Sequence, residues 1–306
     1  VHIGYQTGYY ATGSYNTFIG SEAGKGSATS APYSSGENNV AVGYYALRNL
    51  TTGGNNVAIG KSSSPALTTG TGNVSVGVSA NESSTTGGSN VAIGYNSHRY
   101  ISGGDKNIAI GYAALQSSGT PANNDAQYNI GIGYWALLAI TDGDNNTVLG
   151  NLAASAMTTT SNTVIIGVEA GDAINSTDAN GTVLIGRSAG GSITSGQKNT
   201  IIGYQAGDAM TTSDSNTIVG YQAGTALITS AEQGATLIGK EAGKSLTTGP
   251  YNTVIGRAAL ITATTANSTI AIGDSAGQYL AASTAFVGVM AIGGSALGDA
   301  TGLDTT

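Results

Sequence analysis

The sequence predicts an all-β protein, a parallel β-solenoid (β-roll) with a modal 17-residue coil and about 17 coils. An aliphatic residue followed by Gly recurs seventeen times, and ten of the sixteen intervals between these glycines are 17 residues long. The 306 residues include 48 Gly but only two Phe and one Trp, too few large side chains for the bulky core of a globular enzyme of this length. Small residues must therefore be buried repetitively.

The strand half of each repeat ends at its glycine. The residue before this glycine is Ile or Val in every copy except Leu149. The repeat glycines are Gly4, Gly20, Gly43, Gly60, Gly77, Gly94, Gly111, Gly133, Gly150, Gly167, Gly186, Gly203, Gly220, Gly239, Gly256, Gly273 and Gly293. β-Branched residues before a glycine are typical of a short strand that ends in a turn. We expect this glycine to adopt a backbone geometry closed to residues with a Cβ.

The turn half of the repeat follows the glycine. Ala stands three residues after it in fourteen copies, an apolar residue is frequent seven after it, and TTG or a relative comes next. All four prolines lie outside the strand segment, where a missing N–H would break a hydrogen-bond ladder. Each coil is therefore expected to hold about two strands and two turns, and the chain to be a single continuous array over residues 1–306. Because Val1 falls within a strand motif, we interpret this array as a fragment or shaft segment.

Asparagine recurs four residues before the glycine. In a solenoid these side chains would stack into a ladder that hydrogen-bonds along the axis and satisfies buried turn backbone. This predicted structural ladder consists of Asn16, Asn39, Asn56, Asn73, Asn90, Asn107, Asn129, Asn146, Asn199, Asn216 and Asn252.

Both faces of the strand segment are apolar. The residues one and three before the glycine share one face, and the residue two before it lies on the other. If the first pair faces inward, the second set forms a hydrophobic stripe that needs a cover, and a parallel homotrimer provides one. The predicted subunit interface is Phe18, Val148, Ile165, Leu184, Ile201, Ile218, Leu237 and Val254.

Composition excludes several classes of function. The chain has no Cys and a net charge of −7 with ten Lys and Arg, so we expect no thiolate metal site, no nucleic-acid partner and no membrane insertion. Two G-x-S-x-G segments, at Ser188 and Ser275, lack the strand-to-helix context of a hydrolase. Residues 239–245 fall one residue short of a phosphate loop, and residues 141–146 lack the Gly and Glu of a calcium loop. We therefore predict no catalytic residue, cofactor or metal, and no enzyme.

Three features leave recognition open. Tyr follows the glycine in several repeats. These rings could form an aromatic row that stacks on sugars, or they could shield a strand edge or the seam between subunits. Threonine pairs such as Thr51 and Thr52 would also align, which raises the possibility of ice binding, although TTG is an ordinary way to leave a strand. Insertions at 24–38 and 116–128 are either binding loops or tolerated decoration.

The repeats resemble known families. NNVAIG (55–60), NVAIGYNS (90–97) and NIAIGYAA (107–114) resemble the YadA-like head repeats of trimeric autotransporter adhesins. NTIIGYQAG (199–207), NTIVGYQAG (216–224) and LTTGPYNTVIG (246–256) are similar to repeats of marine phage tail-fibre and virion structural proteins. The resemblance covers nearly all of the chain and implies a trimeric left-handed β-roll in an attachment fibre. The chain departs from it in its longer period and in lacking a heptad stalk, a membrane-anchor barrel and a C-terminal chaperone domain.

From this resemblance we expect a non-enzymatic structural or adhesive fibre, a segment of a phage tail fibre or virion appendage that mediates host attachment. It would be extracellular, on the virion surface, and its partners would be itself and a host-surface glycan or protein receptor. The alternative is the head of a bacterial cell-surface trimeric adhesin. An ice-binding solenoid and a tailspike-like polysaccharide depolymerase are less favoured, the latter because the 17 Asp and Glu stand singly in turns and do not suggest a carboxylate pair.

Overall fold

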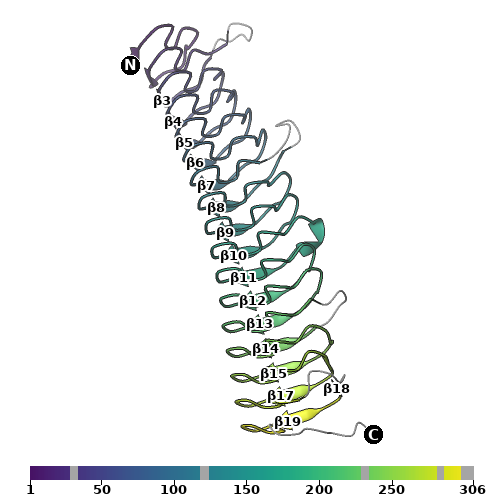
Figure 1. Cartoon of the computed structure of the whole chain (residues 1–306). Helices are drawn as coiled ribbons and strands as arrows, with labels where there is room; N and C mark the ends of the chain where they lie inside the picture. The colour runs from purple at the N-terminus through teal and green to yellow at the C-terminus, as the bar shows by residue number, and fades with distance from the viewer. Residues whose placement is uncertain (28–33, 118–123, 229–233, 281–285, 298–306) are drawn as a thin grey trace. The chain divides into compact units, whose positions relative to one another are not determined.

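The computed structural model describes residues 1–27, 34–117, 124–228, 234–280 and 286–297, and it comprises two compact units, Val1–Thr159 and Thr160–Thr306. Within each unit, successive coils stack so that a short strand of one coil pairs in parallel with the strand of the next (Figure 1). The prediction of an all-β parallel solenoid with a coil of about 17 residues is therefore confirmed.

The described residues of the first unit form nine strands. They are β1 (His2–Ile3), β2 (Thr17–Ile19), β3 (Val40–Val42), β4 (Val57–Ile59), β5 (Val74–Val76), β6 (Val91–Ile93), β7 (Ile108–Ile110), β8 (Ile130–Ile132) and β9 (Thr147–Leu149). The register follows the sequence repeat, since Val57 pairs with Val74 and Ile59 with Val76, each 17 residues further on. Identical repeat positions therefore stack in columns.

The second unit repeats this arrangement. Its strands are β10 (Val164–Ile166), β11 (Val183–Ile185), β12 (Thr200–Ile202), β13 (Thr217–Val219), β14 (Thr236–Ile238), β15 (Thr253–Ile255), β16 (Ala266–Asn267), β17 (Ile270–Ile272), β18 (Phe286–Val287) and β19 (Met290–Ile292), with a 3₁₀ turn, η2, at Thr177–Ala179. The pair β16–β18 forms a separate two-stranded sheet. The other strands pair in repeat register, as Thr200 does with Thr217.

Most coils hold one three-residue strand, so the expectation of two strands per coil is wrong for them. The reason lies in the backbone after the repeat glycine. Positive φ values recur two and four residues after it, as at Gln205 (50°) and Gly207 (56°), and they turn the chain before a second extended segment can form. Backbone N–H groups in these turns still bond to the adjacent coil, as Gln205 N does to the Arg187 carbonyl.

The repeat glycine is required for two independent reasons. Gly43 has φ +134°, a conformation that residues with a Cβ rarely adopt. A Cβ on Gly43 would also lie 2.5 Å from the carbonyl oxygen of Gly60, the equivalent glycine in the next coil. Close stacking of the coils therefore excludes any side chain at this corner.

The strand residue two before the glycine points into the core. The burial pattern of a strand is half-buried, buried, half-buried or exposed, and the central side chain is fully or almost fully buried inside its own chain. The predicted interface is therefore wrong, because the side chains assigned to an outward face fill the interior: Phe18, Val148, Ile165, Leu184, Ile201, Ile218, Leu237 and Val254. The outward face belongs to the residues one and three before the glycine.

Candidate functional site

The outward side of the strands is a surface that repeats from coil to coil among the described residues. In the first unit, this outer strand face consists of two aliphatic columns. The columns are Val40, Val57, Val74, Val91, Ile108 and Ile130, beside Val42, Ile59, Val76, Ile93, Ile110 and Ile132. Ile59 and Ile93 are 41% and 38% exposed, and the neighbouring members are half-buried by stacking on one another. The face is thus apolar, regular and accessible.

The outer strand face of the second unit has a different chemistry. One column becomes threonine over four successive strands, while the other stays aliphatic. These pairs are Thr200 with Ile202, Thr217 with Val219, Thr236 with Ile238, and Thr253 with Ile255. The second unit therefore presents methyl and hydroxyl groups where the first presents mainly valine and isoleucine.

Tyrosines beside the outer strand face stack on one another. The ring centroids of Tyr95 and Tyr112 are 5.3 Å apart, those of Tyr112 and Tyr134 are 5.2 Å apart, and both pairs are within 14° of parallel. Tyr204 and Tyr221 repeat this contact at 5.3 Å. Because the ring faces contact each other, the row presents ring edges, and a sugar that stacks on an aromatic face would meet few free faces here.

The predicted asparagines of the first unit form an unbroken hydrogen-bonded series from Asn16 to Asn146. Asn56 shows the pattern: its Oδ1 accepts from the backbone N of Asn73 at 2.9 Å, and its Nδ2 donates to the Gly70 carbonyl at 2.9 Å and to Asn39 Oδ1 at 3.1 Å. Every asparagine of this series is at most 6% exposed. The amides therefore stabilise turn backbone that is removed from water, and they are not available to a ligand.

The second unit contains a shorter version of this series. Asn199 Oδ1 accepts from the backbone N of Asn216 at 2.9 Å, and Asn252 Oδ1 accepts from the backbone N of Thr269 at 3.0 Å. Thr163 and Thr182 are the buried residues at the equivalent position in the first two coils of this unit. A threonine hydroxyl can replace part of the amide's bonding, as Thr182 does with the Gly196 carbonyl at 3.3 Å.

The threonine pairs are already engaged in the coil. The first hydroxyl of a pair donates to a carbonyl of the next coil, as Thr51 Oγ1 does to Thr68 at 3.0 Å, Thr68 Oγ1 to Thr85 at 2.9 Å and Thr247 Oγ1 to Thr264 at 2.9 Å. A hydroxyl held in this way has a structural role. These bonds weaken the interpretation of the pairs as a free hydroxyl array for ice.

Single acidic residues also have a role within the stack. The carboxylates of Asp105, Asp144 and Asp214 each accept a backbone N–H from the preceding coil at 2.7 Å. Asp144 lies in the segment that resembles a calcium loop, and this bond explains its place there. Within the described ranges, no group of three or more His, Cys, Asp and Glu residues could hold a metal ion.

The other chemical motifs do not assemble into sites. Ser275 is 8% exposed, with its Oγ 3.5 Å from the carboxylate of the adjacent Asp274, and Ser188 lies half-buried in a turn. Both serines belong to the second unit, whereas His2 and His98 belong to the first. In the segment that resembles a phosphate loop, Lys244 pairs with Glu241 at 3.0 Å. The motifs are thus explained by the repeat.

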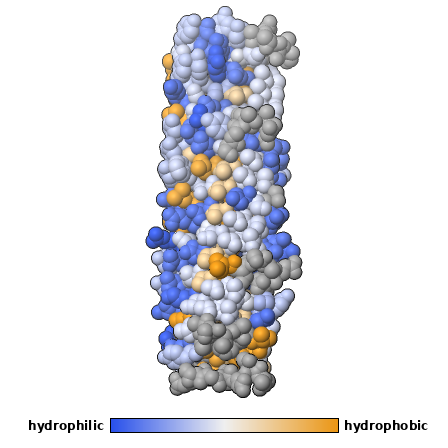
Figure 2. All heavy atoms as spheres, turned by 45° about the vertical axis from the view of Figure 1, so that its right-hand side comes forward, coloured by the Kyte–Doolittle hydropathy of each residue, from blue (hydrophilic) through white to orange (hydrophobic). Residues whose placement is uncertain are grey.

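The two insertions lie partly outside the described residues, at 28–33 and 118–123. Their described ends are tied to neighbouring coils, since Ser34 Oγ donates to the Leu50 carbonyl at 2.7 Å and Asn124 Nδ2 to the Tyr100 carbonyl at 2.9 Å. On the face shown in Figure 2, hydrophobic residues occur in small groups among hydrophilic and neutral ones.

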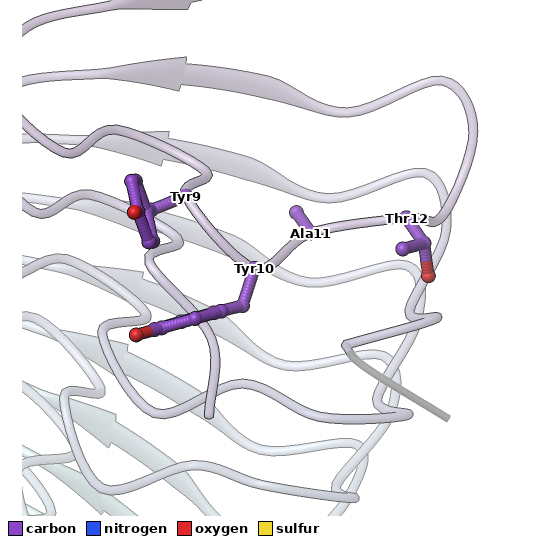
Figure 3. Close-up of a pocket in the computed structure, with 4 residues that line it drawn as sticks. All are labelled: Tyr9, Tyr10, Ala11 and Thr12. Atoms are coloured by element: carbon purple, nitrogen blue, oxygen red, sulfur yellow. The ribbon is translucent and has the colours of Figure 1, made fainter. Parts of the chain in front are cut away.

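A small cavity of about 300 Å³ is lined by Tyr9, Tyr10, Ala11 and Thr12. The rings of Tyr9 and Tyr10 meet edge to face at 4.7 Å and lie toward one end of this segment, with Thr12 at the other (Figure 3). These lining residues include no carboxylate, imidazole or amine. The sequence offered no signal for this cavity beyond the paired tyrosines.

The sequence reasoning also missed a buried histidine. His98 occupies a core position where other coils carry Leu, Gly, Ala, Ser or Asn, and it is 0% exposed. This departure from the repeat was a signal that could have been recognised.

Within the described part of the chain, no helix is long and apolar enough to cross a membrane. Searches of family models, curated proteins and solved structures found no match to this chain.

Proposed function

We propose that this chain is a non-enzymatic shaft segment of a homotrimeric attachment fibre, part of a phage tail fibre or virion appendage. In this proposal it is extracellular, on the virion surface, and connects the particle to a region that binds a host-surface glycan or protein. The observation that carries the proposal is the apolar outer strand face of the first unit. An aliphatic surface repeated at every coil is costly in water unless another surface covers it.

A second copy of the chain is a suitable cover because its columns have the same spacing. Neighbouring strands are about 4.8 Å apart in any parallel sheet, so two copies aligned in parallel match coil by coil. Rotational symmetry then allows the same face to be buried in every subunit. This arrangement keeps the trimer expected from the sequence but moves its contact from the buried central residues to the columns that contain Ile59 and Ile93.

The structural role is also supported by how the repeated polar groups are used. Asn56, Thr68 and Asp105 bond to backbone of adjacent coils, so these groups stabilise the stack. A depolymerase on such a scaffold would need a pair of carboxylates across a groove. Such a pair is not supported by Asp105, Asp144 and Asp214, each of which accepts a backbone N–H.

The bacterial adhesin head is the second candidate. The specific observation in its favour is that VAI strands of the adhesin type, such as Val57–Ile59 and Val91–Ile93, occur in the first unit. The second unit instead carries the Thr-x-Ile strands that are similar to phage repeats, such as Thr200–Ile202. Both candidates share the trimeric, non-catalytic fibre, so oligomeric state tests what they have in common.

The test is the solution mass of the intact chain by light scattering across a dilution series. We expect three times the chain mass of 30.1 kDa. The double variant Ile59→Lys/Ile93→Lys places two charges on the outer strand face and should give a monomer that keeps its β-sheet circular dichroism. Thr71→Lys, in an exposed turn, is the matched control and should remain trimeric.

A stable monomer of the unchanged chain would overturn the proposal. A trimer that persists in the double lysine variant would retain the fibre but place its contact on another face. If Thr71→Lys also dissociates the trimer, the effect comes from charge in general, and the assignment to the outer strand face is wrong.

A further inference from the structure

One core position of the first unit carries a titratable group. Four residues after the repeat glycine, some coils bury leucine, as at Leu115, the two coils before that of Gly94 bury Ser64 and Asn81, and the coil of Gly94 buries His98. The buried residues Ala92 and Ala109 of strands β6 and β7 are apolar. The imidazole thus lies in an interior that combines aliphatic side chains and the asparagine series with other buried polar groups, such as Ser84 and Ser97.

Both ring nitrogens of His98 have asparagine partners. Nδ1 lies 2.8 Å from Asn81 Oδ1, and Nε2 lies 3.1 Å from Asn107 Nδ2. An amide oxygen accepts and an amide nitrogen donates. The ring must therefore carry its proton on Nδ1 and accept through an unprotonated Nε2.

The asparagine series fixes this arrangement. Asn107 Oδ1 accepts from the backbone N of Asn129 at 3.0 Å, and Asn107 Nδ2 also donates to the Ala126 carbonyl at 2.8 Å. Exchanging the amide oxygen and nitrogen of Asn107 would break both bonds. A second proton on His98 would consequently place an N–H against the Asn107 N–H and leave a buried cation without a counter-charge.

The polar network around a protonated His98 ring would be incomplete. Asn81 Nδ2 and Ser84 Oγ are buried and form no hydrogen bond within the described residues. A partly satisfied polar network in a core is weaker than an apolar core or a complete network. The coils around His98 thus combine one titratable group with two polar atoms that already lack partners.

We propose that His98 is an acid-sensitive latch: the neutral ring holds the coils between Asn81 and Asn107 closed, and its protonation opens them locally. The adjacent charged residue, Arg99, pairs with Glu82, and both side chains are partly exposed. Burial lowers the pKa of His98 to about 4, and no charged neighbour contributes to this shift. The unfolded ring has a pKa near 6.5, so closing is disfavoured progressively as pH falls from about 6.5 to about 4.

The test is hydrogen exchange by mass spectrometry on the intact chain, comparing the unchanged protein with His98→Leu. Leucine is the residue that the coils of Gly43, Gly111 and Gly133 carry at this position. Intrinsic exchange rates are nearly equal in the two proteins. The ratio of their observed exchange rates at each pH therefore reports the difference in opening. We expect opening of segment 81–107 to rise by about tenfold per pH unit below pH 6.5 in the unchanged protein, relative to His98→Leu.

The other histidine provides the control. His2→Gln should leave the pH dependence of segment 81–107 unchanged, and a segment of the second unit such as 200–220 should not respond to His98→Leu. The ring itself is a second readout that requires no variant: nuclear magnetic resonance should show an Nδ1-protonated neutral ring with a titration midpoint near pH 4. A midpoint near 6.5, an Nε2-protonated ring, or equal pH dependence in the two proteins would overturn the proposal.

Discussion

The two units fill equivalent positions of their cores with side chains of opposite size. In the first unit, small strand residues such as Ala109 and Gly131 accompany large turn residues such as Leu115 and Leu137. In the second, large strand residues such as Ile201 accompany glycine four positions after the repeat glycine. The centre of each coil is thus filled to a similar volume, and the large side chain comes from the turn in the first unit and from the strand in the second.

The contacts show how closely the two sides fit. A Cβ on Gly131 would clash with Leu115 Cδ1, and a Cβ on Gly171 would lie 2.7 Å from Leu184 Cδ1. The turn position also has a backbone cost that differs between the units, since Leu115 has φ 47° and glycine adopts such values without strain. The first unit therefore holds left-handed leucines at a position where most coils of the second unit hold glycine, although Leu260 of the second unit keeps the leucine at φ 52°.

The asparagine series is the other difference, and removing one of its members should have the largest effect. Asn56→Ala would orphan the buried N–H of Asn73 and the carbonyl of Gly70. Each unsatisfied buried group costs about 1–3 kcal/mol, so we expect a loss of about 4 kcal/mol. Hydrogen exchange of the first unit measures this loss.

Asn56→Thr gives the sharper comparison because the second unit tolerates threonine at Thr163 and Thr182. A threonine hydroxyl can donate to the Gly70 carbonyl, as Thr182 does to Gly196, but its side chain is one atom shorter than the amide and reaches less far toward the Asn73 N–H, so it should recover about half of the loss. Equal stability of the alanine and threonine variants would show that the amide's bond to the carbonyl contributes little.

Exchanging the two core patterns should have the next largest effect. Gly131→Ile alone overpacks the first unit against Leu115 and should cost about 3 kcal/mol. Leu115→Gly alone leaves a cavity and should cost a similar amount. The double variant reproduces the pattern of the second unit and should cost about as much as one single change, about 3 kcal/mol, which corresponds to a coupling of about 3 kcal/mol in a double-mutant cycle by chemical denaturation.

Strict additivity in that cycle would contradict the volume exchange. The control pair is Leu115→Gly with Ile201→Ala, one change in each unit, because these residues belong to different cores. Their effects should add within about 0.5 kcal/mol.

The sequence predicted the coil because its signal is repeated seventeen times. The repeat spacing also predicted the register, as the pairing of Thr200 with Thr217 shows. The direction of the strand faces was not predictable from hydrophobicity, because Val57, Ala58 and Ile59 are all apolar. The deciding fact is volume: the narrow coil accepts one central side chain, Ala58, and leaves Val57 and Ile59 outside. The site of His98 required the three-dimensional neighbours, since Asn81 and Asn107 lie in other coils.

The tyrosine rows offer a smaller test of the same comparison. Tyr112 stacks on Tyr95 and on Tyr134, whereas Tyr204 has one stacked partner, Tyr221. An aromatic pair contributes about 1 kcal/mol beyond its buried area. Tyr112→Leu should therefore cost about 2 kcal/mol and Tyr204→Leu about 1 kcal/mol in chemical denaturation. Equal losses would indicate that the rings contribute by burial alone.

The smallest effect concerns two carboxyls of the second unit. Burial and the neighbouring Glu169 carboxylate raise the pKa of both Asp172 and Asp208. A carboxyl with a raised pKa binds its proton more tightly in the folded chain, so folding gains stability as pH falls through that value and carries the full penalty above it. Asp172→Asn and Asp208→Asn should each stabilise the second unit at pH 7, by at most about 1 kcal/mol because both side chains are partly exposed.

The stability of the two units should depend on pH in opposite directions. Acid removes the carboxylate penalty at Asp172 and Asp208 in the second unit, whereas acid adds a penalty at His98 in the first. The stability gained by Asp172→Asn and Asp208→Asn should therefore disappear as pH falls from 7 through the raised pKa values. The stability of His98→Leu relative to the unchanged protein should instead increase over the same range. If all of these variants follow pH in the same direction, net charge governs the response and the local environments described for Asp172 and His98 do not.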